Sequence, residues 1–174
     1  MLATATDDRV SHQAHPSFAE IIKQLSAAEA KELLEILGEY NVPIVRLLVA
    51  GGTEGNLGHS IAHNHVLPYS AEPDGPPIEN PAVAVWVDNW IRLGLVNVDY
   101  GSRLIREGFY DYAKARPEYE RLVAQSPAGV DDVMITEGVL RSTNFGLRFK
   151  AAVTPGRPGL WPGSPVPPCG WESY

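Results

Sequence analysis

The chain has 174 residues, of which 44% are hydrophobic and 20% are charged, the balance of a globular protein rather than a disordered one. Its formal net charge is −7 at pH 7. Residues 1–80 carry this whole excess, because acidic side chains there outnumber basic ones by 11 to 4. Nucleic-acid binders usually carry a basic surplus, since phosphate contacts supply much of their affinity. The charge therefore disfavours a nucleic-acid partner, although it leaves one possible.

The sequence contains no signal for a membrane. No apolar run approaches the roughly 18 residues that a membrane span needs. The N-terminus lacks the basic stretch followed by an apolar stretch that is typical of a secretory signal. The single cysteine, Cys169, allows no internal disulfide and fits a reducing compartment. We therefore expect a cytoplasmic protein without a membrane span.

Composition divides the chain into three segments. Residues 1–16 are polar and aperiodic, so we expect a disordered tail. Residues 17–153 hold the periodic segments and are expected to form one domain. Residues 154–174 contain six prolines and four glycines, which predicts a disordered or extended tail.

The first half of the domain begins with helical patterns. Residues 17–25 predict a short amphipathic helix, and the next helix begins at a capping box in which Ser26 and Glu29 satisfy each other's backbone amides. Residues 43–49 have the β-branched content of a strand, although two adjacent leucines leave a helix possible. Residues 51–80 are rich in Gly, Pro, His and Asn and are expected to form a long irregular loop.

The most regular pattern lies in residues 83–96, VAVWVDNWIRLGLV. Apolar residues recur at the i, i+3, i+4, i+7 spacing of a helix that packs on a core. We therefore predict that Trp86, Trp90 and Leu93 are buried, and that Asp88 and Arg92 are largely exposed. A glycine ends this helix and strand-like residues follow directly, as where the third helix of many winged-helix domains enters its wing.

The second half predicts further alternation of helix and strand. Residues 104–114 are expected to be helical, and Pro117 to mark a restart. Residues 132–136 and 139–142 predict two strands joined at Glu137-Gly138 as a hairpin. Thr143 or Asn144 can cap a last helix. The expected fold class is α+β: a winged-helix-like domain, mostly helical, with a small antiparallel sheet or wing.

No residue set predicts catalysis or cofactor binding. The glycine-rich residues 51–60 fail the phosphate-loop pattern, because His59 stands where the lysine belongs. His59, His63 and His65 have a spacing that could bind zinc, but the favoured interpretation is solvated loop histidines without a metal. The serines and Cys169 lack a recognisable nucleophile arrangement. We therefore expect no catalytic residues, no metal and no cofactor.

One surface could bind a macromolecule. The outer face of the 83–94 helix and the basic residues further along the chain would form it: Val85, Asn89, Arg92, Arg141, Arg148 and Lys150. Arginine and asparagine are good readers of base edges, whereas Asp88 on the same helix face would repel phosphate. Solvent or a protein contact is the favoured interpretation of this face.

Three blocks in this order resemble the Abi-alpha family of bacterial abortive-infection proteins. The first lies in residues 25–34 (LSAAEAKELL), and the second in residues 88–96 (DNWIRLGLV) is similar to the family's Asn-Leu-x-Arg-Leu-Gly-Leu-Ile segment. The third, in residues 140–149 (LRSTNFGLRF), is close to its Leu-Thr-x-Phe-Gly-x-x-Phe ending. Trp90 and Ser142 stand where the family has leucine. The resemblance implies a role in antiphage defence and transfers no catalytic residues.

The sequence is compatible with three functions. The preferred one is a non-enzymatic cytoplasmic protein of the abortive-infection type that acts through a protein partner or through self-association. The alternative is a DNA-binding winged-helix transcriptional regulator that uses the 81–94 helix and the 131–142 hairpin. A small hydrolase or nucleotide-binding enzyme comes last, because its motifs fail.

Overall fold

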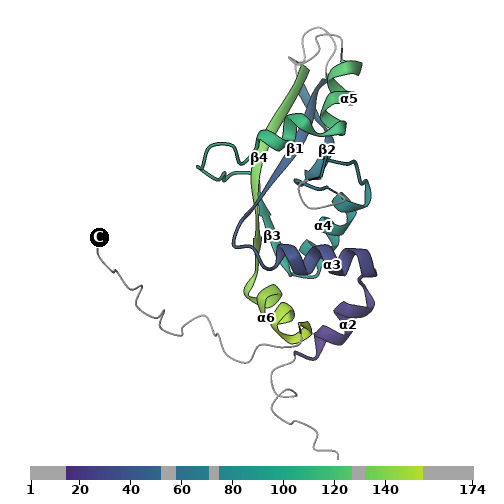
Figure 1. Ribbon diagram of the computed structural model, residues 1–174, viewed down its shortest axis with the longest axis vertical. Helices are drawn as coiled ribbons and strands as arrows, with labels where there is room; N and C mark the ends of the chain where they lie inside the picture. The colour runs from purple at the N-terminus through teal and green to yellow at the C-terminus, as the bar shows by residue number, and fades with distance from the viewer. Residues whose placement is uncertain (1–14, 52–57, 71–74, 127–131, 155–174) are drawn as a thin grey trace, which may run out of the picture.

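The computed structural model describes residues 15–51, 58–70, 75–126 and 132–154. These residues form an α+β fold, with five α-helices, one 3₁₀-helix and a curled four-stranded antiparallel sheet (Figure 1). In chain order the elements are α2 (Ser17–Lys23), α3 (Ala27–Ile36), β1 (Val42–Gly51), β2 (Gly58–Val66), α4 (Ala82–Arg92), β3 (Val96–Asp99), η1 (Asp111–Ala115), α5 (Pro117–Gln125), β4 (Val133–Ser142) and α6 (Asn144–Val153). The expected tails, 1–16 and 154–174, lie almost wholly outside the described residues. None of the helices in the described part has the length and apolar character needed to span a bilayer.

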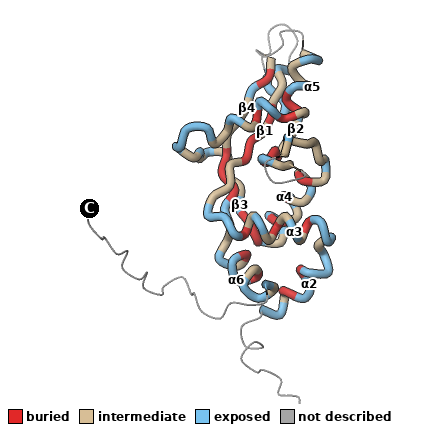
Figure 2. Tube along the Cα trace, in the orientation of Figure 1, coloured by how far each residue is buried: buried red, intermediate tan, exposed pale blue. Residues whose placement is uncertain are grey.

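The sheet has the strand order β2-β1-β4-β3. Its centre is the long pair of β1 and β4, which stay in register from Val42 opposite Leu140 to Val49 opposite Val133. Side chains along a strand alternate between the two faces. The sheet therefore buries one row of apolar residues on each face, and the helices divide between the two faces (Figures 1 and 2).

The larger core lies where α2, α3, α4 and α6 cover one face of the sheet. Trp90 of α4 is its largest fully buried side chain. Phe18 of α2 packs against Phe145 and Phe149 of α6, with ring centroids 5.3 and 5.4 Å apart. The buried members are Phe18, Ile21, Leu33, Leu37, Ile44, Leu67, Val83, Val87, Trp90, Leu95, Val96, Leu140 and Phe149.

The smaller core lies on the opposite face, where η1 and α5 cover the other end of the sheet. Val45 and Leu47 of β1 are fully buried there. The remaining buried members are Val66, Ala113, Tyr119 and Val133. Because β1 and β4 contribute to both cores, the two strands join them into one body.

The helix α4 confirms the main sequence prediction. Trp90 is fully buried, whereas Asp88 and Arg92 are exposed. Trp86 and Leu93 are only half-buried at the margin of the core, so the prediction that they are buried was wrong. Gly94 ends the helix with a positive φ of 73°, a conformation that favours glycine, and β3 follows at once as expected.

The prediction of a long irregular loop at residues 51–80 was wrong in its middle part, because β2 (Gly58–Val66) forms there and pairs with β1. Five of its nine residues are exposed. An exposed edge strand needs little apolar alternation, so residues 58–66 have no period-2 pattern that would predict a strand. Residues 52–57 and 71–74 lie outside the described residues.

Two further elements differ from the prediction. The expected hairpin at residues 132–142 is one continuous strand, β4. Gly138 makes no turn there; it leaves room for the Tyr100 ring, which a Cβ atom would meet at 2.6 Å. Residues 104–110 are not helical, and only a short 3₁₀-helix follows at Asp111–Ala115. Ile105 in this segment is 97% exposed, so the apolar residues that suggested a helix do not form a face packed on the core.

Candidate functional site

A polar cluster joins β2, α4 and the residue after β3. Its centre is His65, which is 6% exposed. The Nε2 atom of His65 lies 3.1 Å from Asp88 Oδ1, and its Nδ1 atom lies 3.0 Å from the Tyr100 hydroxyl. The backbone N–H of His65 also donates to that hydroxyl, at 3.3 Å. One side chain therefore bonds two segments that lie 23 and 35 positions away in the sequence.

The bonds of this cluster fit a neutral imidazole ring. A carboxylate only accepts hydrogen bonds, so Nε2–H of His65 donates to Asp88. In the neutral ring the Nδ1 atom is then an acceptor, and the Tyr100 hydroxyl donates to it. Burial lowers the pKa of His65, and the Asp88 carboxylate opposes this in part. Burial also raises the pKa of Tyr100. Both shifts favour the uncharged imidazole and the uncharged phenol.

Arg46 of β1 extends the cluster across the sheet. Its guanidinium lies 3.8 Å from the centre of the Tyr100 ring, within the range of a cation–π contact. Its Nε–H donates to Asn64 Oδ1 at 3.1 Å. The Tyr100 ring thus lies over β4 at Gly138 and over β1 at Arg46, and it reaches β2 at His65.

The backbone of His65 is strained. Its φ is 54°, and it is the one non-glycine residue with a positive φ among the described residues. This conformation costs roughly 1–3 kcal/mol and persists only where the surroundings hold it. His65 lies within a register irregularity of the β1–β2 pairing, between Val66, which is opposite Val45, and His63, which is opposite Leu47. Asp88 and Tyr100 supply the bonds that hold the imidazole in place.

A cavity of about 230 Å³ lies beside His65. It is bounded by β2, by the segment that leads into α4 and by the start of α5; the lining residues are Ala62, His63, Asn64, His65, Val66, Leu67, Glu79, Asn80, Pro81, Val83, Ala84, Arg116 and Glu118. Arg116 and Glu118 form a buried bidentate pair at 3.1 and 2.7 Å. Arg116 also donates to the Tyr69 carbonyl at 2.7 Å. The buried charges are thus compensated within the protein.

The rim of this cavity carries a second pair. Arg121 of α5 donates to both carboxylate oxygens of Glu79, and these bonds lower the pKa of Glu79. The same guanidinium lies 3.5 Å from His63 Nε2. The expected loop histidines are therefore strand residues in different surroundings: His63 faces Arg121, His65 is buried, and His59 is exposed. Among the described residues, no three His, Cys, Asp or Glu side chains are grouped to hold a metal ion.

This arrangement cross-links the fold. Both ring nitrogens of His65 are hydrogen-bonded to protein side chains. In each of the two Arg–Glu pairs of the cavity, the arginine charge is neutralised by its own glutamate. Proton transfer by His65 to a ligand would require Asp88 or Tyr100 to leave first. The cluster therefore holds β2 against α4.

The sequence-predicted binding face divides into parts that do not share contacts. Val85 is exposed on α4. Asn89 donates to Glu29 Oε1 at 2.7 Å, and Arg92 donates to Gln24 Oε1 at 2.8 Å and to Asn89 Oδ1. The two expected base readers thus bond to the residue that follows α2 and to the first turn of α3.

The other members of that face lie on β4 and α6. Arg141 donates to Asn41 Oδ1 at 3.2 Å and lies 3.7 Å from Asp99 Oδ2. Arg148 is exposed and Lys150 is half-buried on α6. Within the described residues, no hydrogen bond or ion pair joins these three to the α4 residues.

Sequence reasoning missed the His65 cluster. Its members come from β1, β2, α4 and the residue after β3, and no short spacing relates them. The only local indication was the three closely spaced histidines, which suggested a metal site instead. Only the tertiary pairing of β2 with β1 brings His65 to Asp88.

The three blocks that carry the family resemblance meet in space. Thr143 Oγ1 accepts the Gly146 N–H at 2.9 Å and caps α6, while it donates to the Gly94 carbonyl. Thr143 N–H donates to the Leu95 carbonyl at 3.0 Å, which joins the third block to the second. Asn89 bonds to Glu29 of the first block. These motif residues hold the core together.

The described residues thus form an α+β domain in which residues of the three blocks bond to one another. The model of the family described as abortive infection alpha matches residues 1–153, and the chain belongs to this family. A solved structure titled as an uncharacterized protein from the hydrocarbon-degrading marine bacterium Alcanivorax borkumensis SK2 is 12% identical, over 86% of this chain and 98% of that one, with a TM-score of 0.45. No curated protein matches the chain.

Proposed function

We propose that this chain is a non-enzymatic interaction protein of abortive-infection-type antiphage defence, acting in the cytoplasm. Membership of the family supports the defence role, and the single cysteine supports the compartment. The observation that carries the interaction role is the projecting loop, residues 102–109. Its tip presents Ile105, which is 97% exposed.

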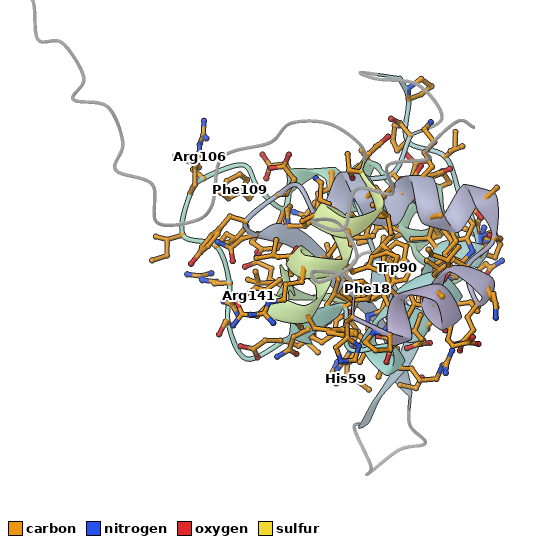
Figure 3. The ribbon with its side chains drawn as sticks, turned by 90° about the horizontal axis from the view of Figure 1, so that it is seen from below. Phe18, His59, Trp90, Arg106, Phe109 and Arg141 are labelled. Atoms are coloured by element: carbon orange, nitrogen blue, oxygen red, sulfur yellow. The ribbon has the colours of Figure 1, made fainter. Side chains whose placement is uncertain are left out.

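The projecting loop is tied to the sheet at its base. Tyr110 accepts the Leu104 N–H at 2.9 Å and donates to the Gly138 carbonyl at 2.9 Å. The Arg106 guanidinium lies 5.5 Å from the centre of the Phe109 ring, and both side chains lie far from the core residues Phe18 and Trp90 (Figure 3). An apolar side chain presented on a fixed loop beside arginine is typical of an anchor at a protein interface.

The polar cluster supports the non-enzymatic part of the proposal. A general base needs a ring nitrogen within reach of a ligand proton, but both nitrogens of His65 bond to side chains of the protein. Asp88 is the exposed member of the cluster, with 68% of its side chain open to solvent. Asp88→Asn keeps an acceptor for the His65 N–H and removes the negative charge. It therefore tests whether function needs the carboxylate itself or only the hydrogen bond that holds the cluster together.

The DNA-binding alternative has less support. The helix-to-strand step from α4 into β3 is the feature that relates the fold to a winged helix. However, Asn89 and Arg92 bond to Glu29 and Gln24, and β4 runs straight where the wing hairpin was expected. Base contacts by these two residues would first have to break bonds within the domain.

A phage-challenge assay tests the proposed function. Cells that express the wild type, Ile105→Asp, Tyr40→Asp or Asp88→Asn at equal levels are infected with a panel of phages. Tyr40 is the matched control, since it is 89% exposed on another part of the surface. We expect the wild type, Tyr40→Asp and Asp88→Asn to reduce plaque formation, and Ile105→Asp to lose most of this protection. Full protection by Ile105→Asp would contradict the interaction role, and loss of protection in a folded Asp88→Asn protein would contradict the non-enzymatic role.

A further inference from the structure

The outer edge of β4 is left open by its neighbour. β3 is four residues long and pairs only with residues 139–142 of β4. β4 itself begins at Val133. Its first half therefore has β1 on one side and no strand of the described residues on the other.

The pairing shows which backbone groups face this edge. Thr143 N–H donates to the Leu95 carbonyl, on the β3 side. Backbone groups of every second residue in a strand point to the same side, so Val133, Ile135 and Glu137 also point away from β1. Pro43 agrees with this alternation, because it lies opposite Val139 and has no N–H to donate. Among the described residues, no backbone group outside β4 bonds to the amides of these three.

The open edge lacks the usual protection against pairing. Natural sheets protect edges with bulges, prolines, charges, short strands or covering segments. The β2 edge has register irregularities, and β3 is short. Residues 133–136 of β4, by contrast, contain no charge and no proline and pair with β1 without a register shift. Two acidic residues flank this segment: Asp132 directly precedes Val133, and Glu137 follows Thr136 and faces Arg103 at 3.6 Å.

There is room beside this edge for another strand. After β3 the chain turns away, because Asp99 accepts the Gly101 N–H at 2.8 Å and the Ser102 hydroxyl at 2.5 Å. The turn leaves an open hollow of about 440 Å³ between residues 100–103 and residues 135–137. The projecting loop extends past β4 on this same side, away from β1 (Figure 1).

We propose that a second copy of this chain pairs with this edge, strand β4 against strand β4, in antiparallel orientation about Ile135. In this arrangement Ile135 lies opposite its own counterpart and Val133 lies opposite Glu137, so both copies make the same hydrogen bonds. Such an isologous contact closes as a dimer. This inference rests on the proposed interaction role and names the partner.

The apolar side chains around the edge favour a second copy as the occupant. Met134 is 43% exposed beside the edge, and Ile105 is 97% exposed on the loop that extends past it. In a two-fold pair, the projecting loop of each copy extends toward the other copy, so both apolar side chains lie near the interface. A short strand from another protein would leave the Ile105 side chain uncovered.

Sedimentation of the full chain over a range of concentrations tests this pairing. Two variants place a charge at the interface, Met134→Lys and Ile105→Asp. Their matched controls are Leu147→Lys on α6, where leucine is 44% exposed, and Tyr40→Asp. We expect a concentration-dependent dimer whose Kd rises at least about tenfold, equal to about 1.4 kcal/mol, in the first two variants and stays unchanged in the controls.

Amide hydrogen exchange gives a residue-specific test. In the concentrated protein the amides of Ile135 and Glu137 should be protected, and on dilution they should exchange freely. The Thr136 amide points to β1 and should stay protected at both concentrations, which controls for unfolding.

Two results would overturn the pairing. One is a monomer at all concentrations with fast exchange at Ile135 and Glu137, which would leave the edge to a strand of another protein. The other is a dimer that all four variants weaken equally. Because neither measurement involves phage, a monomeric wild type refutes the dimer and leaves the defence assay to decide the interaction role separately.

Discussion

At the scale of single residues, His65 connects three segments that are distant in sequence. Its ring bonds to Asp88 and Tyr100, and its backbone keeps a positive φ. Burial lowers the pKa of the imidazole, so the folded protein binds a proton there less readily than the unfolded chain. The stability that depends on the neutral ring is fully present above the unfolded pKa and is lost as the pH falls toward the folded pKa.

The free energy of unfolding should therefore decrease between pH 7.5 and pH 5.5. In His65→Gln this part of the pH dependence should disappear, and stability at pH 7.5 should fall by about 1–3 kcal/mol because buried partners lose their bonds. Urea unfolding at a series of pH values measures both quantities. His59→Gln, at an exposed position, is the control. An unchanged pH slope in His65→Gln would contradict the assignment of a neutral buried ring.

Gly138 controls the position of Tyr100. A Cβ atom at Gly138 would lie 2.6 Å from Tyr100 Cδ1 and 3.0 Å from the Asp99 carbonyl oxygen, so alanine forces the ring away from His65. We expect Gly138→Ala to lower the free energy of unfolding by about 1–3 kcal/mol. The chemical shifts of the Tyr100 and His65 rings should change with it. Gly101→Ala is the control, because its Cβ would meet only Asp99 Oδ1, at 3.2 Å.

At the scale of elements, helices with local signals could be predicted from the sequence. The capping box at Ser26 and Glu29 is present as expected, and Thr143 caps α6. The apolar periodicity of residues 83–93 predicted α4, and Gly94 ends this helix as expected. The predicted strand at residues 43–49 is β1. These signals act within a few residues, so one segment of sequence contains them.

Other elements depend on contacts that no short segment contains. β2 is a strand because β1 pairs with it, although its own residues are mostly exposed and polar. β4 passes straight through Glu137-Gly138 because Tyr100 fills the space above the glycine. The members of the polar cluster could not be predicted for the same reason, since their contacts arise only when the sheet has formed.

The contact between α6 and the end of α4 depends on one glycine. A Cβ atom at Gly146 would lie 2.1 Å from the Leu95 carbonyl oxygen, which belongs to backbone and cannot rotate away. We expect Gly146→Ala to cost more than Gly138→Ala, upward of about 3 kcal/mol, because α6 must move off the core. Thermal unfolding of both variants checks the order. Equal melting temperatures would show that α6 adjusts freely.

At the scale of the whole molecule, the domain has two unequal cores on opposite faces of one sheet. The larger core contains Trp90 and the aromatic contact between α2 and α6, and the smaller contains Tyr119 and Ala113. Segments with less buried apolar surface open at lower free energy. The end of the sheet that carries α5 should therefore open before the end that carries α4.

Native-state hydrogen exchange measures this difference. We expect amides in α5 to exchange through an opening that exposes less surface than global unfolding, and amides in α4 to exchange only through global unfolding. The dependence on denaturant separates the two routes, since its slope follows the exposed surface. Identical slopes and free energies in α4 and α5 would show that the domain opens only as one unit.

The pairing of β1 with β4 has a consequence for the synthesis of this protein. Val45 lies opposite Glu137, so the central strand emerges from the ribosome about 90 residues before its partner. At about 5–20 residues per second, β1 waits roughly 5–20 s with one side unpaired. β2 follows within a few residues and can cover the other side early. The nascent chain therefore passes through a period in which a buried strand of the finished sheet is accessible to chaperones and to other nascent chains.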